Sequence, residues 1–229
     1  MRGTDSSTAV TRNTLRRQIA DALRDEVLAG RLQPGQEFTV KQIAEQYGVS
    51  ATPVREALVD LSAQGLLDSD EHRGFKVHQF SVEDYRGMIQ ARSLIVDGVF
   101  RHISKPGSKR GPDLHGKALV SVRRRAEEAA RAARCGDLDI LIGYDLRFWR
   151  EIGEVVANRY ISDFLHRLRV QAWVFAVPYL RADAELRDWL WRGHEDLVDA
   201  VALGDAEKAR AVIDSYHDHG LAWADRLER

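Results

Sequence analysis

Two predicted helices meet at the sequence Tyr47-Gly48-Val49-Ser50, and this junction constrains the fold more than any other part of the chain. Glycine at position 48 permits the left-handed backbone conformation that a tight turn between two helices requires. Val49 is placed to pack between the helices, and Ser50 is a favoured residue type for the cap of the second one. This spacing of helix, tight turn and helix predicts a helix-turn-helix motif.

Helical elements are also predicted ahead of this junction. Apolar residues at helical spacing predict a first helix that is capped by Asn13 or Thr14 and ended by Gly30. After a Pro-Gly turn, Thr39 is expected to cap a short helix over residues 40–46. This short helix is the first of the two that meet at the tight turn.

A small β-hairpin is predicted after the second helix of the motif. Two extended runs, residues 66–68 and 75–78, flank a polar and charged segment that has the composition of a hairpin tip. A helix-turn-helix followed by such a hairpin is the pattern of a winged helix. We expect this domain to span residues 14–79 and to follow a flexible arm over residues 1–13.

The remainder of the chain shows only helical periodicity. Asp84 stands three residues after Ser81, a spacing typical of a capping box at the start of a helix, and Pro178 is expected to kink or end the fourth helix. Turns are predicted at residues 105–111, 135–137, 158, 181–184 and 204–205. The predicted fold class is therefore mainly α, with an N-terminal winged helix-turn-helix and a C-terminal all-α antiparallel bundle of about six helices over residues 80–229.

Composition excludes several classes of protein. Hydrophobic residues make up 44% of the chain and charged residues 30%, and no run reaches the roughly 18 apolar residues of a membrane span. The first thirteen residues are polar and do not resemble a signal peptide. The single cysteine, Cys135, cannot form an intrachain disulfide. We expect a cytoplasmic protein with no membrane association.

Net charge gives no support for nucleic-acid binding, because residues 1–78 carry ten Lys and Arg against eleven Asp and Glu. A DNA contact therefore depends on where individual cations lie. In a major groove, the helix after Ser50 would present Thr52 and Arg55, and arginine is suited to a bidentate contact with guanine. The predicted DNA-binding residues are Lys41, Ser50, Thr52, Pro53, Arg55, Arg73 and Gly74.

This segment resembles the GntR family of winged-helix regulators. The resemblance covers nearly all of residues 15–78, and its most specific part is the string PVREAL at residues 53–58, followed by RGFKV at residues 73–77. The family usually has arginine directly after the cap serine, whereas this chain has Ala51. The resemblance implies DNA binding, with one direct contact of the family missing.

The C-terminal part resembles the FadR-like branch of that family, whose effector domain is of the FCD type. The fragments GYDLRFW, VVAN and GHEDLVDAVALGDAEKA match its pattern in order. Many members bind a divalent metal through an aspartate and three histidines, which here correspond to Asp145, Trp149, His194 and Tyr216. Since Trp149 and Tyr216 replace two histidines, the site is expected to be absent or degenerate, with Asp145 and His194 as its remaining ligands. Two alternatives stay open at this point. In one, a small helix rotation brings in His217 as a further ligand; in the other, the degenerate site binds a zinc or nickel ion.

Periodicity gives an independent reason to expect a cavity in the bundle. Four apolar helix faces are each interrupted by one polar residue, namely Arg92, Asp145, His194 and Tyr216. Buried polar groups require partners, so these four residues are expected to face one another or a common cavity. One alternative is a structural network without a ligand, formed by the pairs Arg92–Asp145 and His194–Tyr216.

If the cavity binds a ligand, Arg92 and His194 are expected to hold a carboxylate and Trp149 to form an apolar wall. The predicted effector-binding residues are Arg92, Asp145, Trp149, His194 and Tyr216. The remaining histidines are interpreted as surface residues; they are His72, His78, His102, His115, His166 and His219.

These observations favour a homodimeric repressor that binds double-stranded operator DNA and responds to a small organic acid. The effector and dimerisation functions are both expected in residues 80–229. No enzyme is expected, although a metal-dependent hydrolase built on Asp145 and His194 remains one alternative. The other is an adaptor whose winged helix contacts protein.

Overall fold

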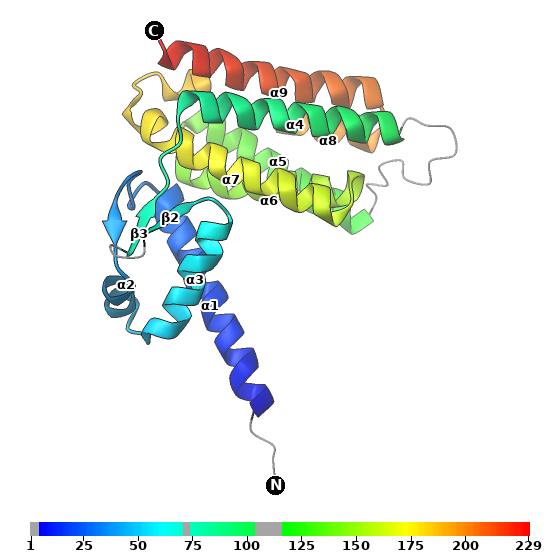
Figure 1. Ribbon diagram of the computed structural model, residues 1–229. Helices are drawn as coiled ribbons and strands as arrows, with labels where there is room; N and C mark the ends of the chain where they lie inside the picture. Colours follow the sequence, from blue (N-terminus) through cyan, green and yellow to red (C-terminus); the bar gives the residue numbers. More distant parts are fainter. Residues whose placement is uncertain (1–4, 71–73, 104–115) are drawn as a thin grey trace. The chain divides into compact units, whose positions relative to one another are not determined.

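The computed structural model describes residues 5–70, 74–103 and 116–229. The chain divides into two compact units, Met1–Phe80 and Ser81–Arg229 (Figure 1). Among the described residues, no helix combines the length and the apolar character that crossing a membrane requires.

The first unit is a winged helix-turn-helix. Its elements are α1 (Asp5–Leu28), β1 (Glu37–Phe38), α2 (Val40–Tyr47), α3 (Ala51–Ala63), β2 (Leu67–Asp70) and β3 (Gly74–Val77). The strands form an antiparallel sheet in the order β1-β3-β2, with Phe38 opposite Phe75 and Leu67 opposite Val77. The predicted hairpin is confirmed, and β1 is an additional strand that sequence patterns did not indicate.

Helix α1 is longer than predicted. It begins at Asp5, so the predicted start at Asn13 or Thr14 is wrong, while residues 1–4 lie outside the described part. The physical reason is that no glycine or proline interrupts the sequence from Asp5 to Leu28. The predicted stop is confirmed, since Gly30 has a φ of 70° and its N–H donates to the carbonyl of Val27.

The helix-turn-helix junction follows the predicted pattern. Thr39 forms a capping box with Gln42, and α2 ends at Gly48, which has a φ of 64°. Ser50 occupies the cap position of α3, but its side chain makes no capping hydrogen bond. A cap side chain accepts from the second or third helical N–H, and the third residue is Pro53, which has none.

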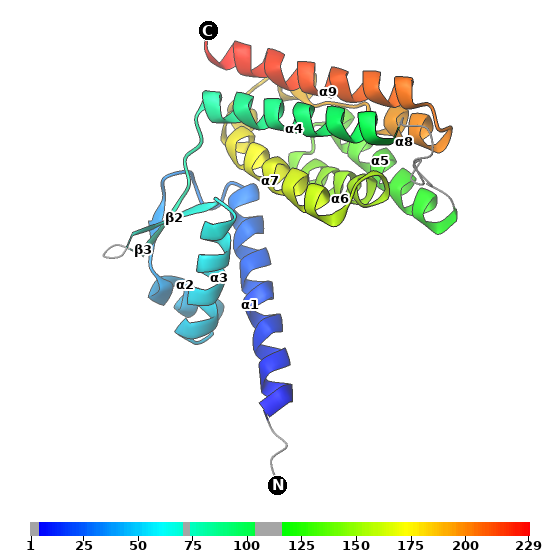
Figure 2. The ribbon, with the colours of Figure 1, turned by 45° about the vertical axis from the view of Figure 1, so that its right-hand side comes forward.

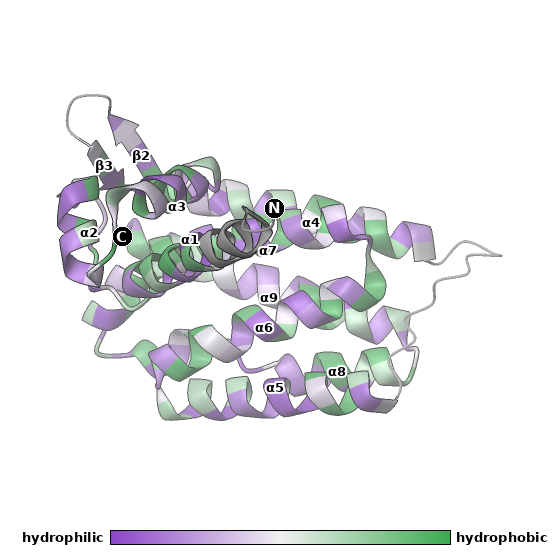
Figure 3. Ribbon diagram, turned by 90° about the horizontal axis from the view of Figure 1, so that it is seen from below, coloured by the Kyte–Doolittle hydropathy of each residue, from purple (hydrophilic) through white to green (hydrophobic). Residues whose placement is uncertain are grey.

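The second unit is a bundle of helices. Its elements are α4 (Val82–Ile103), α5 (Gly116–Cys135), α6 (Leu138–Val156), α7 (Arg159–Ala182), the 3₁₀ helix η1 (Leu186–Trp189), α8 (His194–Ala202) and α9 (Ala206–Leu227). Helix α4 packs against α7 and α9, α5 against α6 and α8, and α8 against α9. Figures 1 and 2 both show α4 and α9 side by side. In Figure 3, hydrophobic and hydrophilic bands alternate along these helices, as expected where one face is buried.

The start of the bundle and most of its turns match the predictions. The amide of Ser81 donates to Asp84 over 2.8 Å, and the amide of Asp84 donates back to the Ser81 hydroxyl over 3.0 Å. Asp137 and Asn158 cap α6 and α7. The turn predicted at residues 105–111 lies outside the described residues.

The structure adds two details of the bundle. Helix α7 continues past Pro178 to Ala182, so of the two effects predicted for this proline, a kink or an end of the helix, the second is wrong. Helix α8 has only nine residues, because residues 190–193 before it are not helical. The tertiary reason is Trp191, whose ring packs at 5.9 Å from that of Trp149 and lies so close to Gly193 that a Cβ there would be 2.5 Å from it.

Candidate functional site

The N-terminal turns of α3 present an exposed polar surface on the first unit. Ala51, Thr52 and Arg55 are exposed, and the guanidinium of Arg55 has no hydrogen-bond or ion-pair partner among the described residues. The first amides of α3 have no intrahelical acceptor, and the Ser50 side chain does not cap them. A free guanidinium beside free helix N–H groups is an arrangement that phosphates and base edges can accept.

The other residues predicted to contact DNA have different surroundings. Lys41 is exposed on α2 and lies 3.8 Å from the carboxylate of Glu45. Pro53 is buried in the core of the unit, so its inclusion in the DNA-binding set is corrected. Gly74 has a φ of 102°, and a Cβ at this position would lie 2.7 Å from the carbonyl oxygen of Phe38, which explains why glycine is needed there. Arg73 lies outside the described residues.

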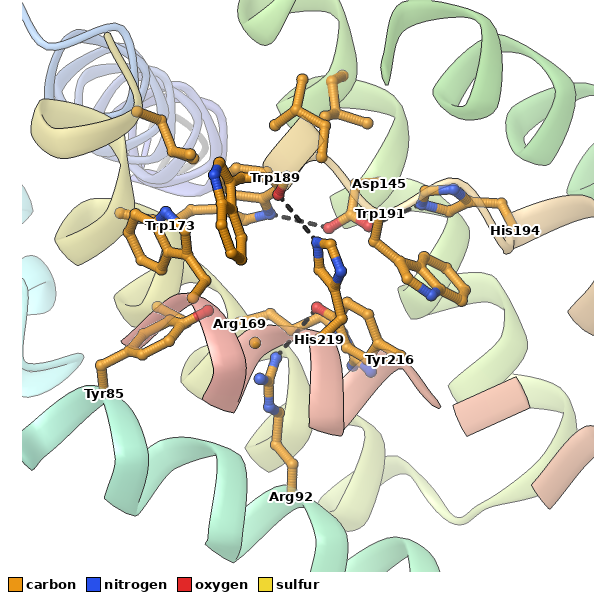
Figure 4. A pocket seen from close by; sticks show the side chains of 17 residues that line it. Tyr85, Arg92, Asp145, Arg169, Trp173, Trp189, Trp191, His194, Tyr216 and His219 are labelled. Carbon is orange, nitrogen blue, oxygen red and sulfur yellow. Dashed lines mark hydrogen bonds and ion pairs between the residues drawn. The ribbon is translucent and has the colours of Figure 1, made fainter. Parts of the chain in front are cut away.

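A cavity of about 70 Å³ lies inside the second unit (Figure 4). A single water requires about 10–15 Å³ of cavity volume, so the cavity has room for a small molecule. Six aromatic side chains contribute to its wall, namely Tyr85, Trp173, Trp189, Trp191, Tyr216 and Trp223. Arg92, Asp145, Arg169, His194 and His219 supply its charged or titratable groups.

Asp145 is the acceptor at the centre of this wall. Its side chain is 3% exposed, and Oδ1 accepts from Nε1 of Trp149 and Nε2 of His194, both at 2.9 Å. Oδ2 accepts from Nε1 of Trp173 at 2.8 Å. Burial acts to raise the pKa of Asp145, but the hydrogen bonds from His194 and Trp173 and the charge of Arg169 outweigh it and lower the pKa. The carboxylate therefore joins α6, α7 and α8 as an anion whose two oxygens are both satisfied.

Two buried arginines face the same cavity without an ion-pair partner. Arg92 is 3% exposed and Arg169 is 4% exposed, and no carboxylate of the described residues lies within salt-bridge distance of either. Arg92 donates to the hydroxyl of Tyr216 over 3.3 Å, and the Arg169 guanidinium lies 3.9 Å from the ring centre of Trp149. The Nε atoms of both arginines lack a hydrogen-bond partner in the described part of the chain.

Burial and the neighbouring Arg92 lower the pKa of Arg169 to about 10, so Arg169 remains charged at neutral pH. Asp145 supplies one negative charge against these two guanidinium groups. The cavity therefore has an excess of buried positive charge that a bound anion would balance.

The structure brings four of the five predicted effector-binding residues to this cavity. Arg92, Asp145, His194 and Tyr216 all line it, but their pairing differs from the predicted network, because Arg92 contacts Tyr216 and His194 contacts Asp145. Trp149 does not line this cavity, and its Nε1 donates to Asp145, so its assignment as a wall of the cavity is corrected.

Sequence reasoning missed two polar residues of the cavity. Arg169 interrupts an apolar face of α7 at the spacing Leu165, Arg169, Ala172, Ala176, and the criterion that selected Arg92 would also have found it. His219 was interpreted as a surface residue, yet it lines the cavity with its Nε2 3.0 Å from the Trp189 carbonyl oxygen. No sequence signal distinguished it from the other histidines.

The residues at the family's metal-binding positions do not fit a metal ion. Trp149 directs its N–H at Asp145, and an indole N–H is a donor without a lone pair to offer. The Tyr216 hydroxyl accepts from Arg92. Among the described residues there is no group of three or more His, Cys, Asp or Glu side chains placed to hold a metal. Asp145 and His194 remain adjacent, as a hydrogen-bonded pair.

His217 is buried beside this cluster, and neither of its ring nitrogens has a partner among the described residues. Burial and the charges of Arg92 and Arg169 lower the pKa of His217 to about 3. In the unfolded chain its pKa is about 6.5, so between these two values the unfolded state binds more protons and stability falls as the pH falls.

At pH 4.5 we therefore expect this histidine to reduce the free energy of unfolding by about 2–3 kcal/mol relative to pH 7. His217→Leu should lose that part of the pH dependence when urea unfolding is measured at both pH values. His102→Leu, which changes an exposed histidine of α4, serves as the matched control. Equal pH dependence in the wild type and His217→Leu would contradict the assignment.

Comparisons with known proteins agree with this architecture. The family described as "Bacterial regulatory proteins, gntR family" matches residues 9–77, and the FCD domain matches residues 112–219. The regulator McbR of Escherichia coli (strain K12) is 38% identical over 219 residues, covering 90% of each chain. The probable D-xylose utilization operon transcriptional repressor of Paenarthrobacter nicotinovorans is 29% identical over 208 residues, covering 91% of this chain and 88% of the relative.

Solved structures show the same fold. E. coli McbR/YncC superposes with a TM-score of 0.70 at 23% identity and covers 94% of this chain and 99% of the other. A GntR regulator from Rhodococcus sp. RHA1 also gives a TM-score of 0.70, at 19% identity, covering 93% and 99% of the two chains.

A winged helix-turn-helix joined to a helical domain with a ligand-sized cavity defines a one-component transcriptional regulator. The chain belongs to the GntR family of DNA-binding transcriptional regulators and carries a C-terminal effector-binding domain of the FCD type. The predicted family, fold class and general function are thus confirmed. Both of these relatives are named as transcriptional regulators.

Proposed function

We propose that this chain is a cytoplasmic, homodimeric repressor whose affinity for operator DNA is controlled by a small carboxylate bound in the cavity of the second unit. The observation that carries the effector proposal is the pair of buried guanidinium groups, Arg92 and Arg169, that face one cavity without an ion-pair partner. Two arginines provide the planar, charged donors that recognise a carboxylate.

In this proposal the unit Met1–Phe80 is the DNA-binding domain. Helix α3 enters the major groove with Thr52 and Arg55 facing the bases, and Lys41 contacts the phosphate backbone. The contact of Arg73 with the minor groove rests on the sequence alone. A homodimer would place two copies of α3 on a roughly palindromic operator.

The arginine pair takes the role that a metal ion has in many relatives. Aromatic rings surround the charged groups, so a ligand with a carboxylate and a compact ring or sugar-like body suits the cavity. The name of one relative associates that protein with D-xylose utilization. For this chain we therefore include a sugar acid among the first ligands to test.

Helix α4 offers a route by which the effector changes DNA binding. Arg92 and Tyr85 both line the cavity, and α4 begins at Val82, directly after the DNA-binding unit. A ligand that draws Arg92 toward the cavity acts on the helix to which that unit is connected. We expect the effector to weaken operator binding about 5-fold to 150-fold, the usual range of coupling between two sites.

The test is a thermal-shift and calorimetric screen of xylonate, gluconate, lactate, citrate and benzoate in the presence of a chelator. Xylose, glucose and benzamide serve as uncharged counterparts. We expect at least one acid to bind while its uncharged counterpart does not, and Arg92→Ala and Arg169→Met to weaken its binding at least tenfold.

Arg101→Ala, which changes an exposed arginine on α4, is the matched control and should bind like the wild type. Identical binding by the wild type, Arg92→Ala and Arg169→Met would remove both arginines from the site. Turnover of a ligand that depends on an added metal would favour the hydrolase alternative. Absence of salt-sensitive DNA binding would favour the adaptor alternative.

A further inference from the structure

A second cavity, of about 80 Å³, lies in the same unit, and Trp149 contributes to its wall. Its wall comes from α4, α6, α7, α8 and α9 and is mainly apolar, with contributions from Val96, Phe100, Ile152, Leu165, Val201 and Ile213. Gly204, Asp205 and Ala206 line it as well and are exposed, so this turn between α8 and α9 forms its mouth. Among the described residues, Arg169 is the only one that lines both cavities.

Water is a poor occupant for this second cavity. Protein interiors are close-packed, and voids larger than one water are few. A buried water needs two to four polar partners, whereas this wall is built almost entirely from aliphatic and aromatic groups. The cavity is several times larger than the roughly 10–15 Å³ that one water requires. An apolar molecule matches both its size and its lining.

The wall contains one buried cation, and it lacks an ion-pair partner. The guanidinium of Arg169 lies against the ring of Trp149, and its Nε has no hydrogen-bond partner among the described residues. The carboxylate of Asp205 stands at the exposed mouth, where it already accepts the amide of Lys208 over 2.9 Å. An anionic group is thus repelled at the mouth and attracted at the inner end, beside Arg169.

We propose that this cavity is a second ligand site, for a small hydrophobic monocarboxylate. The carboxylate contacts Arg169, and the hydrocarbon part packs against the apolar side chains between Arg169 and the mouth. Because Arg169 also lines the first cavity, two bound anions share one guanidinium and repel each other. Occupation of the second site therefore weakens binding of a carboxylate in the first.

The experiment is isothermal titration calorimetry of the full chain with butanoate, pentanoate and hexanoate, and with hexan-1-ol as the uncharged match. We expect one hexanoate per chain, with affinity rising about threefold to fourfold for each added CH₂ group, and weaker binding of hexan-1-ol. Ala209→Leu and Val96→Phe each fill the second cavity and should weaken hexanoate binding at least tenfold. Ala209 is buried in α9, so a larger side chain there also affects folding. If Ala209→Leu does not fold, Val96→Phe tests the second cavity in its place.

The matched control is Ala176→Leu, a substitution of the same size in the wall of the first cavity only. It should leave hexanoate binding within about twofold of the wild type. This variant also distinguishes the second site from the proposed effector site. If Ala176→Leu no longer binds the effector acid found in the screen but still binds hexanoate, the two ligands occupy separate sites. Hexanoate binding that survives both filling variants, or that is lost only in Ala176→Leu, would overturn the second site while leaving the first intact.

Discussion

Replacing Asp145 by alanine is expected to reduce the free energy of unfolding by about 3–5 kcal/mol. The change removes the one acceptor shared by Trp149, Trp173 and His194, and it leaves the buried donors of Trp149 and His194 and the half-buried donor of Trp173 without a partner. It also removes the nearest compensating charge of Arg169. The melting temperature of the second unit, followed by circular dichroism, should fall by roughly 10 °C.

Two further variants test whether the loss of stability comes from the buried carboxylate of Asp145. Asp145→Asn keeps the shape and one acceptor oxygen, so we expect its loss of stability to lie between those of the wild type and Asp145→Ala. Asp163→Ala removes an exposed carboxylate of α7 that pairs with Arg150 at 3.7 Å, and it should change stability by less than about 1 kcal/mol. An Asp145→Ala protein as stable as Asp163→Ala would show that the buried cluster does not depend on this carboxylate.

Arg55→Ala is expected to weaken binding to operator DNA by about 1–3 kcal/mol, a factor of roughly 5–150, and to relax sequence preference at one base pair. The reason is that the Arg55 guanidinium is exposed on the first turns of α3 and has no intramolecular partner among the described residues. Fluorescence polarisation with DNA from upstream of the gene, at several salt concentrations, measures both effects.

Lys41→Ala should behave differently from Arg55→Ala. A phosphate contact carries no sequence information, so its loss should weaken binding to specific and unrelated DNA alike and reduce the salt dependence by about one ion. Arg124→Ala, an exposed arginine of α5, is the control that should bind as the wild type does. Unchanged affinity and specificity in Arg55→Ala would place the recognition surface elsewhere.

Much of the first unit was predictable because its signals are local. The capping box of Thr39 and Gln42 and the left-handed Gly48 depend on residues within four positions of each other. The missed strand β1 has only two residues, and it exists because Gly74 lets β3 approach Phe38. A pairing of this kind involves residues far apart in the sequence, and no local pattern indicates it.

The candidate site was predictable only in part, for a related reason. A polar residue within an apolar helix face shows that it is buried, and this criterion selected Arg92, Asp145 and His194. It does not show which partner the residue meets, because that depends on how each helix is rotated against its neighbours. The alternative that paired Arg92 with Asp145 was therefore wrong, whereas the expectation that both face a common cavity agrees with the structure.

The sequence by itself determined the winged helix-turn-helix, the helical bundle and the presence of buried polar groups, because caps, turns and periodicity act within a few residues. Only the tertiary structure decided that Asp145 accepts hydrogen bonds from Trp173 and His194, and that Arg169 faces two cavities. The donors Trp173 and His194 lie 28 and 49 positions from Asp145 on other helices, and packing of whole helix faces brings them together. A pattern of neighbouring residues does not indicate which helix faces pack against each other.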